Sequence, residues 1–290
     1  MRRREETKAR FRVGARLGKE LTVLGVIDRR GSEGLTIVWN HAAWCPMACK
    51  VFRSYRDAER EAKVLSLLTH PNTVRFFGLS KPANLLMEFL EGPTLEDLIY
   101  RQPRRRLAIS DAVRVAMYVG AALHHIHRTG YVHLDIKPAN IIVARGGRPV
   151  LYDFGSARQP SECPRSIAGT NPYIAPEECL RQRIAPAADV FGLGVTLYEM
   201  LTGELPFPLG RHRDDFPQTR SAPVPLRRRR HLSAALEDLV LSCLARDPAA
   251  RPPIAGLLLR LHEQITKGQR MWPPGFHPEQ GPTLDKMTAT

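Results

Sequence analysis

The chain has 290 residues, of which 43% are hydrophobic, and this is enough to bury the cores of one or two globular units. Its net charge of +14 favours anionic partners such as nucleotides, acidic proteins, nucleic acid or anionic lipid, and it carries no information about the fold. No run of 18 residues is apolar and uncharged, and the basic start lacks the apolar core of a signal peptide, so we expect a cytoplasmic protein without a transmembrane helix.

The first third of the chain is predicted to be mostly β. Between residues 57 and 68, apolar residues recur at helical spacing, and His70, followed by proline, ends this helix. We therefore expect a small β-rich lobe over residues 21–90, preceded by a basic extension at residues 1–20. Its strands are short apolar runs separated by turns, at residues 21–27, 35–39, 47–52, 73–78 and 84–89.

The rest of the chain is predicted to be mostly helical. Ser110 is a favourable helix start and Gly130 a favourable stop. We expect a larger helical lobe over residues 91–267, and a disordered tail at residues 268–290, where proline and glycine are frequent. The fold class is thus α+β, with the active site expected between the two lobes, because ligands favour such interfaces. The predicted helices cover residues 94–100, 110–129, 192–201 and 232–244.

Three motifs in the middle of the chain carry the chemistry. The segment Val-His-Leu-Asp-Ile-Lys-Pro-Ala-Asn, residues 132–140, is followed by Asp-Phe-Gly at 153–155 and Ala-Pro-Glu at 175–177. In this order the motifs resemble those of the eukaryotic-type protein kinase family: the catalytic loop H-x-D-x-K-P-x-N, then DFG, then APE. The resemblance covers roughly residues 21–265. The lysine in the loop, together with Gly169 and Thr170, is similar to the serine/threonine type, and the Arg/Ala-rich chain suggests a bacterial origin.

The resemblance implies a two-lobed kinase fold that transfers the γ-phosphate of ATP to serine or threonine hydroxyls of proteins. Asp135 would accept or orient the proton of the substrate hydroxyl, and Lys137 would neutralise charge on the transferred phosphoryl group. Asn140 and Asp153 would hold Mg²⁺, a hard cation that prefers carboxylate and amide oxygens. Each of these residues alone could be an ordinary turn or capping residue, so the prediction depends on their combined spacing.

A lysine on the third predicted strand is the next expected element. The segment Met-Ala-Cys-Lys-Val, residues 47–51, resembles the V-A-I-K segment of the family, so Lys50 would hold the α- and β-phosphates. The alternative is a surface lysine at a strand end. Its acidic partner on the following helix would be Glu61, with Glu59 as the rival. Glu61 lies eleven positions after Lys50, which is short for the family and indicates a helix trimmed at its front.

The predicted nucleotide pocket departs from the family in its glycine-rich loop. Arg29 stands where the first glycine of G-x-G-x-x-G is expected, and without the motifs around it this segment would be an ordinary hairpin turn. Glycines still allow a backbone to approach phosphates closely. The resemblance places the adenine between two apolar residues and against a hinge segment. The residues that it assigns to the nucleotide here are Gly31, Gly34, Ala48, Met87, Glu88, Leu90 and Ile142.

The residue before Asp135 is Leu134, where many family members have the arginine that pairs with a phosphorylated activation loop. Leucine cannot form that charge-assisted bond. We therefore expect that activity does not require phosphorylation of Ser161, Ser166 or Thr170, although Thr170 also serves in the family as a contact to the catalytic loop. Two further matches are architectural: Asp189 would brace the catalytic loop, and Glu177 would form a buried ion pair with Arg251.

The sequence contains three arginine runs, at residues 2–4, 104–106 and 227–230. A charge run is most often a solvated face, and the functional alternative is docking of an acidic protein. Aromatic residues do not interleave with the runs, so nucleic acid is an unlikely partner. The alternative to an active kinase is a pseudokinase that binds ATP or acts as a scaffold, which the irregular glycine loop and Leu134 would suit. A small-molecule kinase is a third possibility, disfavoured by the segment at 169–177.

Overall fold

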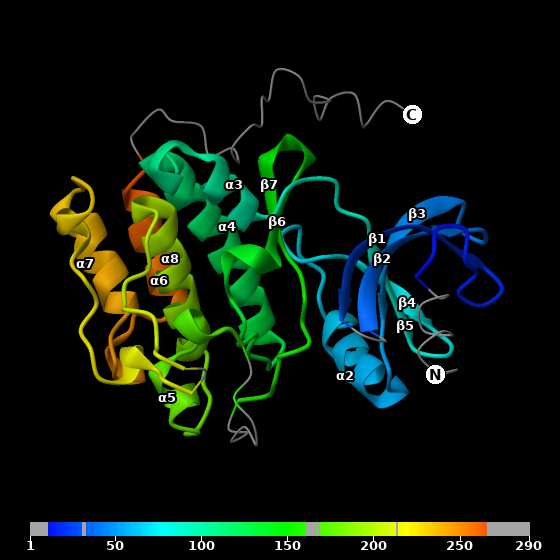
Figure 1. The fold of residues 1–290 in the computed structure, drawn as a ribbon. Helices are drawn as coiled ribbons and strands as arrows, with labels where there is room; N and C mark the ends of the chain where they lie inside the picture. Colours follow the sequence, from blue (N-terminus) through cyan, green and yellow to red (C-terminus); the bar gives the residue numbers. More distant parts are fainter. Residues whose placement is uncertain (1–10, 31–32, 161–166, 168, 213, 266–290) are drawn as a thin grey trace, which may run out of the picture. The chain divides into compact units, whose positions relative to one another are not determined.

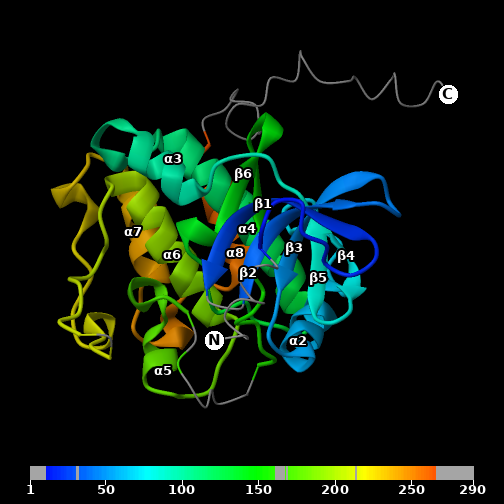
Figure 2. The ribbon, with the colours of Figure 1, turned by 45° about the vertical axis from the view of Figure 1, so that its right-hand side comes forward.

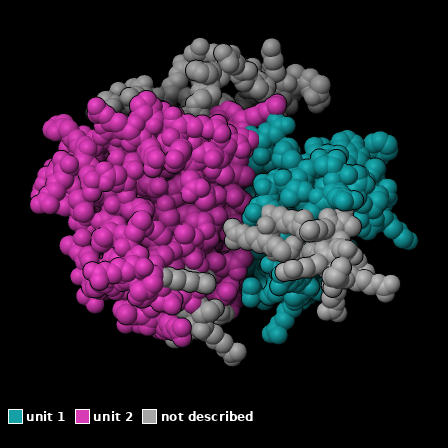
Figure 3. All heavy atoms as spheres, in the orientation of Figure 1, with its two compact units in different colours: residues 1–69, 73–91 teal, residues 70–72, 92–290 magenta. Residues whose placement is uncertain are grey.

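The computed structural model describes residues 11–265, apart from 31–32, 161–166, 168 and 213. The chain divides into two compact units, shown in different colours in Figure 3. Unit 1 comprises residues 1–69 and 73–91, and unit 2 comprises residues 70–72 and 92–290. No helix in the described part of the chain is both long and apolar enough to cross a membrane. Gly31, Ser161, Ser166, the arginine run at 2–4 and the predicted tail at 268–290 lie outside the described residues.

Unit 1 is built on one antiparallel sheet of five strands in the order β1-β2-β3-β5-β4 (Figure 1). The five predicted strands are present, but the fourth begins at Phe76 rather than at Thr73, and the buried Thr73 and Val74 lie in the irregular segment before it. Phe11 and Leu17 lie in the core of this sheet, so unit 1 extends in front of residue 21. The strands are Leu21–Arg30 (β1), Glu33–Asn40 (β2), Cys45–Val51 (β3), Phe76–Ser80 (β4) and Asn84–Glu88 (β5).

One helix of unit 1, α2 (Tyr55–Leu65), packs against β4 and β5. Alanine, valine and leucine side chains on one face form the apolar stripe that a helix covering a sheet requires. The helix begins two residues earlier and ends three residues earlier than the periodicity predicted. Glu61 is buried on the same face as Ala58 and Ala62, and a carboxylate at an apolar position requires a partner.

Unit 2 is mainly helical, with α4 and α6 side by side in its interior (Figures 1 and 2). α6 begins five residues before the predicted start. The prediction missed this part because the helix is buried on all sides and its sequence has little one-sided periodicity. α8 was not predicted; it follows Pro253 and packs on α4. The helices are Leu95–Arg101 (α3), Ile109–Arg128 (α4), Pro176–Cys179 (α5), Ala187–Thr202 (α6), Ala234–Cys243 (α7) and Ile254–Glu263 (α8).

A small antiparallel hairpin of unit 2 frames the catalytic-loop motif. Its strands are β6 (Ile141–Ala144) and β7 (Arg148–Leu151), and β6 follows directly after the short 3-10 helix η2 (Pro138–Asn140). Asp153 comes two residues after β7, and the backbone of Tyr152 donates to the Asn140 carbonyl at 3.1 Å. The hairpin therefore brings the catalytic-loop and DFG segments together.

Candidate active site

In unit 1 the structure pairs Lys50 with Glu61. The Lys50 Nζ atom lies 2.9 Å from Glu61 Oε1 and 2.7 Å from Oε2. The Glu61 side chain is 1% exposed and that of Lys50 is 24% exposed, so the ammonium group remains accessible while the carboxylate is buried. Glu59, the predicted rival, is exposed on the opposite face of α2. α2 thus reaches the lysine although only eleven residues separate the two partners.

The pairing follows from the register of the sheet. Lys50 lies on β3 between Leu35 of β2 and Leu85 of β5, so its side chain emerges from the middle of the sheet. The Lys50 Nζ atom also lies 5.2 Å from the centroid of the Phe52 ring. The strand of this lysine is paired on both sides, and a buried carboxylate holds its ammonium group. The position of the positive charge is therefore fixed, which is the property needed to bind a phosphate.

The predicted adenine residues of unit 1 lie together on β3 and at the end of β5. Ala48 faces Met87 in the sheet register, and both side chains are buried. Glu88 is partly buried, with its N–H donating to the Arg75 carbonyl at 2.8 Å, and Leu90 is buried just beyond the strand. The fourth apolar residue of the predicted adenine pocket, Ile142, belongs to unit 2, where it lies half-buried on β6.

Gly34 has a packing reason to be glycine. It faces Arg29 in the β1–β2 hairpin, and a Cβ atom would lie 2.7 Å from the Asp28 carbonyl and 2.8 Å from the Phe11 ring. Contacts this short are not tolerated by a real side chain, so the hairpin itself excludes other residues. A role for Gly34 toward phosphate stays a prediction.

In unit 2, one carboxylate collects the polar groups of the catalytic-loop motif. The Asp135 Oδ2 atom accepts bonds from Lys137 Nζ at 2.8 Å and from Asn140 Nδ2 at 2.7 Å. The Asn140 amide also donates to the Asp135 carbonyl at 2.9 Å. The Thr170 hydroxyl donates to Asp135 Oδ1 at 3.3 Å and accepts from Lys137 Nζ at 2.5 Å. Three side chains, two from the loop itself and one from a segment 30 residues further along the chain, therefore meet at a single carboxylate.

Asp189 anchors the backbone of the catalytic loop. Its buried carboxylate accepts the backbone N–H of His133 at 2.9 Å and that of Leu134 at 2.8 Å. His127 Nε2 lies 2.8 Å from the same carboxylate. Burial by itself raises the pKa of Asp189, but the hydrogen bond and charge of His127 and the contacts with His133 outweigh it, so the pKa lies below its ordinary value. The ionised Asp189 thus fixes the backbone in front of Asp135.

The loop and its surroundings adopt backbone conformations that few residues tolerate. Leu134 and Asp153 have φ values of 67° and 63°, in the left-handed region. Gly169 has a φ of +98°, and a Cβ atom there would lie 2.8 Å from the Leu134 carbonyl. Outliers of this kind persist only where the surroundings hold them, which makes them typical of functional segments.

The residues predicted to hold Mg²⁺ fit a hard cation by their donor atoms. Both hydrogens on Asn140 Nδ2 are directed at Asp135, so the amide oxygen points away from that carboxylate. Asp153 follows β7, and one of its oxygens accepts the Gly155 N–H at 3.4 Å. An amide oxygen and a carboxylate are suitable ligands for Mg²⁺, which usually takes one or two protein oxygens and keeps several waters.

Two polar contacts near the loop were not predicted. His127 bonds Asp189, and it lies in a sequence rich in histidine where spacing alone does not single it out. The Tyr173 hydroxyl donates to Glu199 Oε2 at 2.5 Å. Burial raises the pKa of Glu199, so the short bond from Tyr173 ends on a desolvated carboxylate. An acidic residue among apolar neighbours near the end of α6 was the available signal for Glu199.

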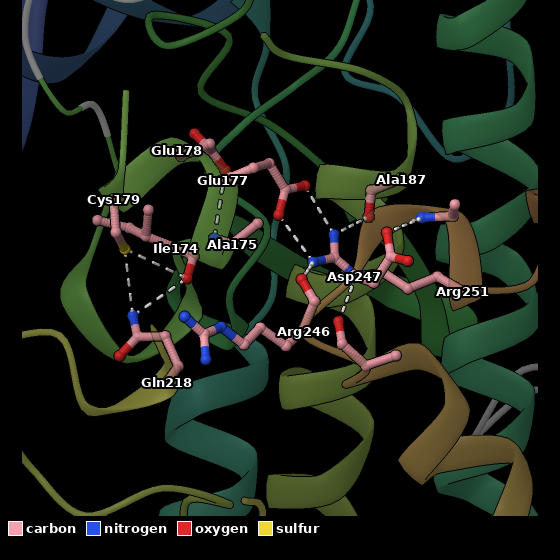
Figure 4. Close-up of polar contacts among 12 residues, drawn as sticks. Ile174, Ala175, Glu177, Glu178, Cys179, Ala187, Gln218, Arg246, Asp247 and Arg251 are labelled. Atoms are coloured by element: carbon pink, nitrogen blue, oxygen red, sulfur yellow. Dashed lines mark hydrogen bonds and ion pairs between the residues drawn. The ribbon is translucent and has the colours of Figure 1, made fainter. Parts of the chain in front are cut away.

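The predicted ion pair between Glu177 and Arg251 is present and fully buried (Figure 4). Two parallel bonds of 2.7 Å join the guanidinium to the carboxylate. Arg251 also donates to the carbonyls of Ala187 and Ala245, at 2.9 Å and 2.8 Å. The pair ties α5, which follows the segment of Thr170, to the start of α6 and the turn before α8.

Comparison with known proteins identifies the family. The family model for the protein kinase domain matches residues 34–260. The serine/threonine-protein kinase PknB of Mycolicibacterium smegmatis is 32% identical over 236 residues, which is 72% of this chain and 36% of that protein. Sperm motility kinase 2A of Mus musculus is 30% identical over 87% of this chain and 51% of its own length. The chain thus spans about a third to a half of these curated relatives. On the strength of the domain match, the chain belongs to the protein kinase family.

Proposed function

We propose that this chain is a serine/threonine protein kinase that transfers the γ-phosphate of ATP to hydroxyl groups of protein substrates. The observation that carries the proposal is the arrangement at Asp135, whose carboxylate is bonded by Lys137, Asn140 and Thr170. Phosphoryl transfer requires little covalent work from a protein, and depends on alignment and on charge neutralisation. The names of the relatives support the same activity.

Asp135 is the base or orienting group in this proposal. Its Oδ2 atom already accepts two short bonds, whereas Oδ1 accepts, among the described residues, only the longer bond from the Thr170 hydroxyl. Oδ1 is therefore the atom for the hydroxyl of the substrate. The bonds on Oδ2 fix the rotation of the carboxylate, so that a serine or threonine hydroxyl meets an oriented acceptor.

Lys137 and Lys50 supply the positive charge. Lys137 Nζ lies between Asp135 and Thr170, and we propose that it neutralises the phosphoryl group during transfer. Lys50, held by Glu61, would bind the α- and β-phosphates. Mg²⁺ held by Asn140 and Asp153 would supply further neutralisation of phosphate charge. Residues 21–90 would thus bind the nucleotide, and residues 91–267 would carry the catalytic groups of the loop.

The adenine ring is assigned to apolar residues of both units in this proposal. Ala48 and Met87 offer a buried apolar surface on neighbouring strands, and Ile142 offers a second one on β6. The backbone at Glu88 and Leu90 would supply the polar contacts. Gly31 and Gly34 would line the phosphates.

The proposed partners and cellular compartment of the kinase agree with its chemistry. Partners are a protein substrate with a serine or threonine acceptor and an acidic protein that binds the arginine runs. The four described cysteines are free thiols, which suits the reducing conditions of the cytoplasm, where ATP and Mg²⁺ are available. A pseudokinase is the alternative, favoured by Leu134 and by the arginine in the glycine-rich loop.

The deciding experiment measures transfer of labelled γ-phosphate from Mg-ATP to a basic test protein and to the chain itself. Asp135→Asn should lower the rate by about 10²- to 10⁴-fold, the usual contribution of a general base. Asp238→Asn, an exposed carboxylate on α7, is the matched control and should leave the rate unchanged. Label on serine or threonine in the parent and in Asp238→Asn, but not in Asp135→Asn, supports the kinase. Bound ATP without transfer in any variant would instead establish the pseudokinase.

A further inference from the structure

Two arginine runs that lie far apart in the sequence meet on one surface of unit 2. Arg106 Nη1 donates to the Arg229 carbonyl at 3.3 Å, across 123 residues of sequence. Arg230 Nη1 donates to the carbonyls of Leu107 and Leu201, at 2.6 Å and 3.0 Å. We call the combined set the arginine surface, which comprises Arg104, Arg105, Arg106, Arg227, Arg228, Arg229 and Arg230.

The backbone that carries this surface is tightly constrained. Gly203 ends α6 with a φ of +76°, and a Cβ atom there would lie 2.4 Å from the Arg104 carbonyl. Arg104 and Arg105 themselves have φ values of 58° and 53°, which are unfavourable for long side chains. The first run is therefore held against the end of α6 at some energetic cost, and the fold fixes the backbone that carries its arginines.

The surface carries more positive charge than its neighbours balance. In the described part of the chain, only two of its arginines have a carboxylate partner: Arg229 pairs with Glu204, and Arg227 lies 3.7 Å from Glu237. Burial and the nearby charge of Arg106 lower the pKa of Arg230, as expected where like charges crowd. Arg104 and Arg228 are exposed, and neither has an ion-pair or hydrogen-bond partner for its guanidinium among the described residues.

We propose that the arginine surface is a docking site for an acidic segment of a partner protein. Guanidinium groups bind carboxylates through paired N–H donors, and those of Arg104 and Arg228 are exposed and available for such bonds. The exposed ring beside the surface, Tyr100, has Arg105 over it at 4.3 Å, and neither run contains an aromatic side chain on which successive bases could stack. Apart from Tyr100, neither run is flanked by a large exposed apolar side chain that could enter a membrane.

The test is direct binding of a fluorescein-labelled peptide of five Glu-Gly repeats to the full chain, measured by anisotropy at 50 mM and 200 mM salt. The double variant Arg104→Asn, Arg228→Gln should bind at least about tenfold more weakly, because each lost group makes charge-assisted bonds. Asparagine tolerates the left-handed backbone at position 104. The single variant Arg228→Glu should weaken binding too, and independently of position 104. The matched control Arg128→Gln, Arg246→Gln removes two other exposed arginines of unit 2 and should change binding less than about twofold.

The proposal predicts a specific, rather than a diffuse, charge effect. Binding should be weaker at 200 mM salt, and a peptide of Gln-Gly repeats should not bind. Equal binding by the parent and the double variant would overturn the proposal, and so would an equal loss in the control. Displacement of the peptide by duplex DNA or by phosphatidylserine vesicles, with tighter binding that depends on the same two arginines, would overturn the choice of partner.

Recruitment of substrates through this surface rests on the proposed kinase function, but the binding does not. The peptide should bind equally well to the Asp135→Asn variant, so a failure of docking and a failure of catalysis are distinguishable. In the active chain, a substrate with an appended Glu-Gly segment should show a lower KM and an unchanged kcat. The gain in KM should disappear in the arginine double variant.

Discussion

At the residue scale, the pair of Lys50 and Glu61 shows how burial selects between two candidate acids. Both glutamates lie on α2, but only Glu61 is on the face that covers the sheet. A buried carboxylate must be paired, and the lysine satisfies both of its oxygens. In turn, the carboxylate holds the ammonium group where a phosphate would need it.

This pairing predicts that Glu61→Gln lowers kcat/KM for ATP by on the order of 10²-fold, because the lysine loses its fixed position. Glu59→Gln is the matched control, since it makes the same chemical change at an exposed position two residues away. Steady-state kinetics at several ATP concentrations checks both variants. Equal rates for the two variants would show that the pair does not position Lys50 for catalysis.

His133 gives a pH prediction. Its ring is fully buried against Phe154, with ring centroids 4.8 Å apart, and burial lowers its pKa although Asp189, Asp135 and Asp153 act in the opposite direction. The unfolded chain therefore binds a proton below pH 6.5 that the folded chain releases, so stability should fall as the pH drops below 6.5. The contribution is at most about 1.4 kcal/mol per pH unit.

The measurement for His133 compares urea unfolding at pH 7.5 and pH 5.5. His133→Asn keeps an acceptor for the Asp135 N–H, which the ring accepts at 3.3 Å, but it cannot titrate. The loss of stability between the two pH values should be smaller in this variant than in the parent. The exposed His231→Asn should behave like the parent. An unchanged pH dependence in His133→Asn would refute the assignment.

At the element scale, the buried pair of Glu177 and Arg251 links elements that are far apart in the sequence. The Arg251 side chain is 0% exposed, and its charge is satisfied by the carboxylate and by carbonyls around it (Figure 4). The guanidinium also lies 5.0 Å from the centroid of the Phe191 ring on α6. One arginine therefore contacts α5, α6 and the turn before α8.

Removing both members of this pair should cost less than the two separate removals added together. Glu177→Gln leaves a buried cation without its counter-charge and should lower the free energy of unfolding by about 3–5 kcal/mol. The double variant Glu177→Gln, Arg251→Met should lose less than the sum of the two single changes. Asp57→Asn, in an exposed pair with Arg60, should cost less than about 1 kcal/mol. Additive losses in urea unfolding would indicate that the two side chains act independently.

The same elements show what the sequence could and could not predict. Motif order identified Asp135, Asn140 and Asp153 because their spacing is set by a local turn and hairpin. Short apolar runs separated by turns located β1 to β5, since turn residues mark where each strand ends. The start of α6 was missed because a helix buried on all sides has no polar face to mark it. His127 and Glu199 were missed because their partners lie 62 and 26 residues away.

At the scale of the whole molecule, the positive charges behind the net charge of +14 are balanced by acidic neighbours to different degrees in different regions. Much of the positive charge on α2 has acidic neighbours along the helix, whereas the arginine surface of unit 2 gathers two runs around two carboxylates. Each compact unit carries one part of the proposed chemistry: a fixed lysine in unit 1 and a fixed carboxylate in unit 2. The fold thus gathers sequence-distant charges into two separate features, which we propose bind nucleotide and an acidic partner.

The activity of the whole chain should not depend on phosphorylation of its activation segment. Leu134 is buried, and its N–H is bonded to Asp189, so the position before Asp135 offers no cation to a phosphate group. Phosphatase-treated chain should keep its rate within about twofold, and so should the variant Ser161→Ala, Ser166→Ala. Thr170→Ala should lose activity even without phosphate, because the hydroxyl bonds Asp135 and Lys137, whereas Thr170→Ser should retain it. A loss of more than tenfold on phosphatase treatment, reversed by rephosphorylation, would show that another cation replaces the missing arginine.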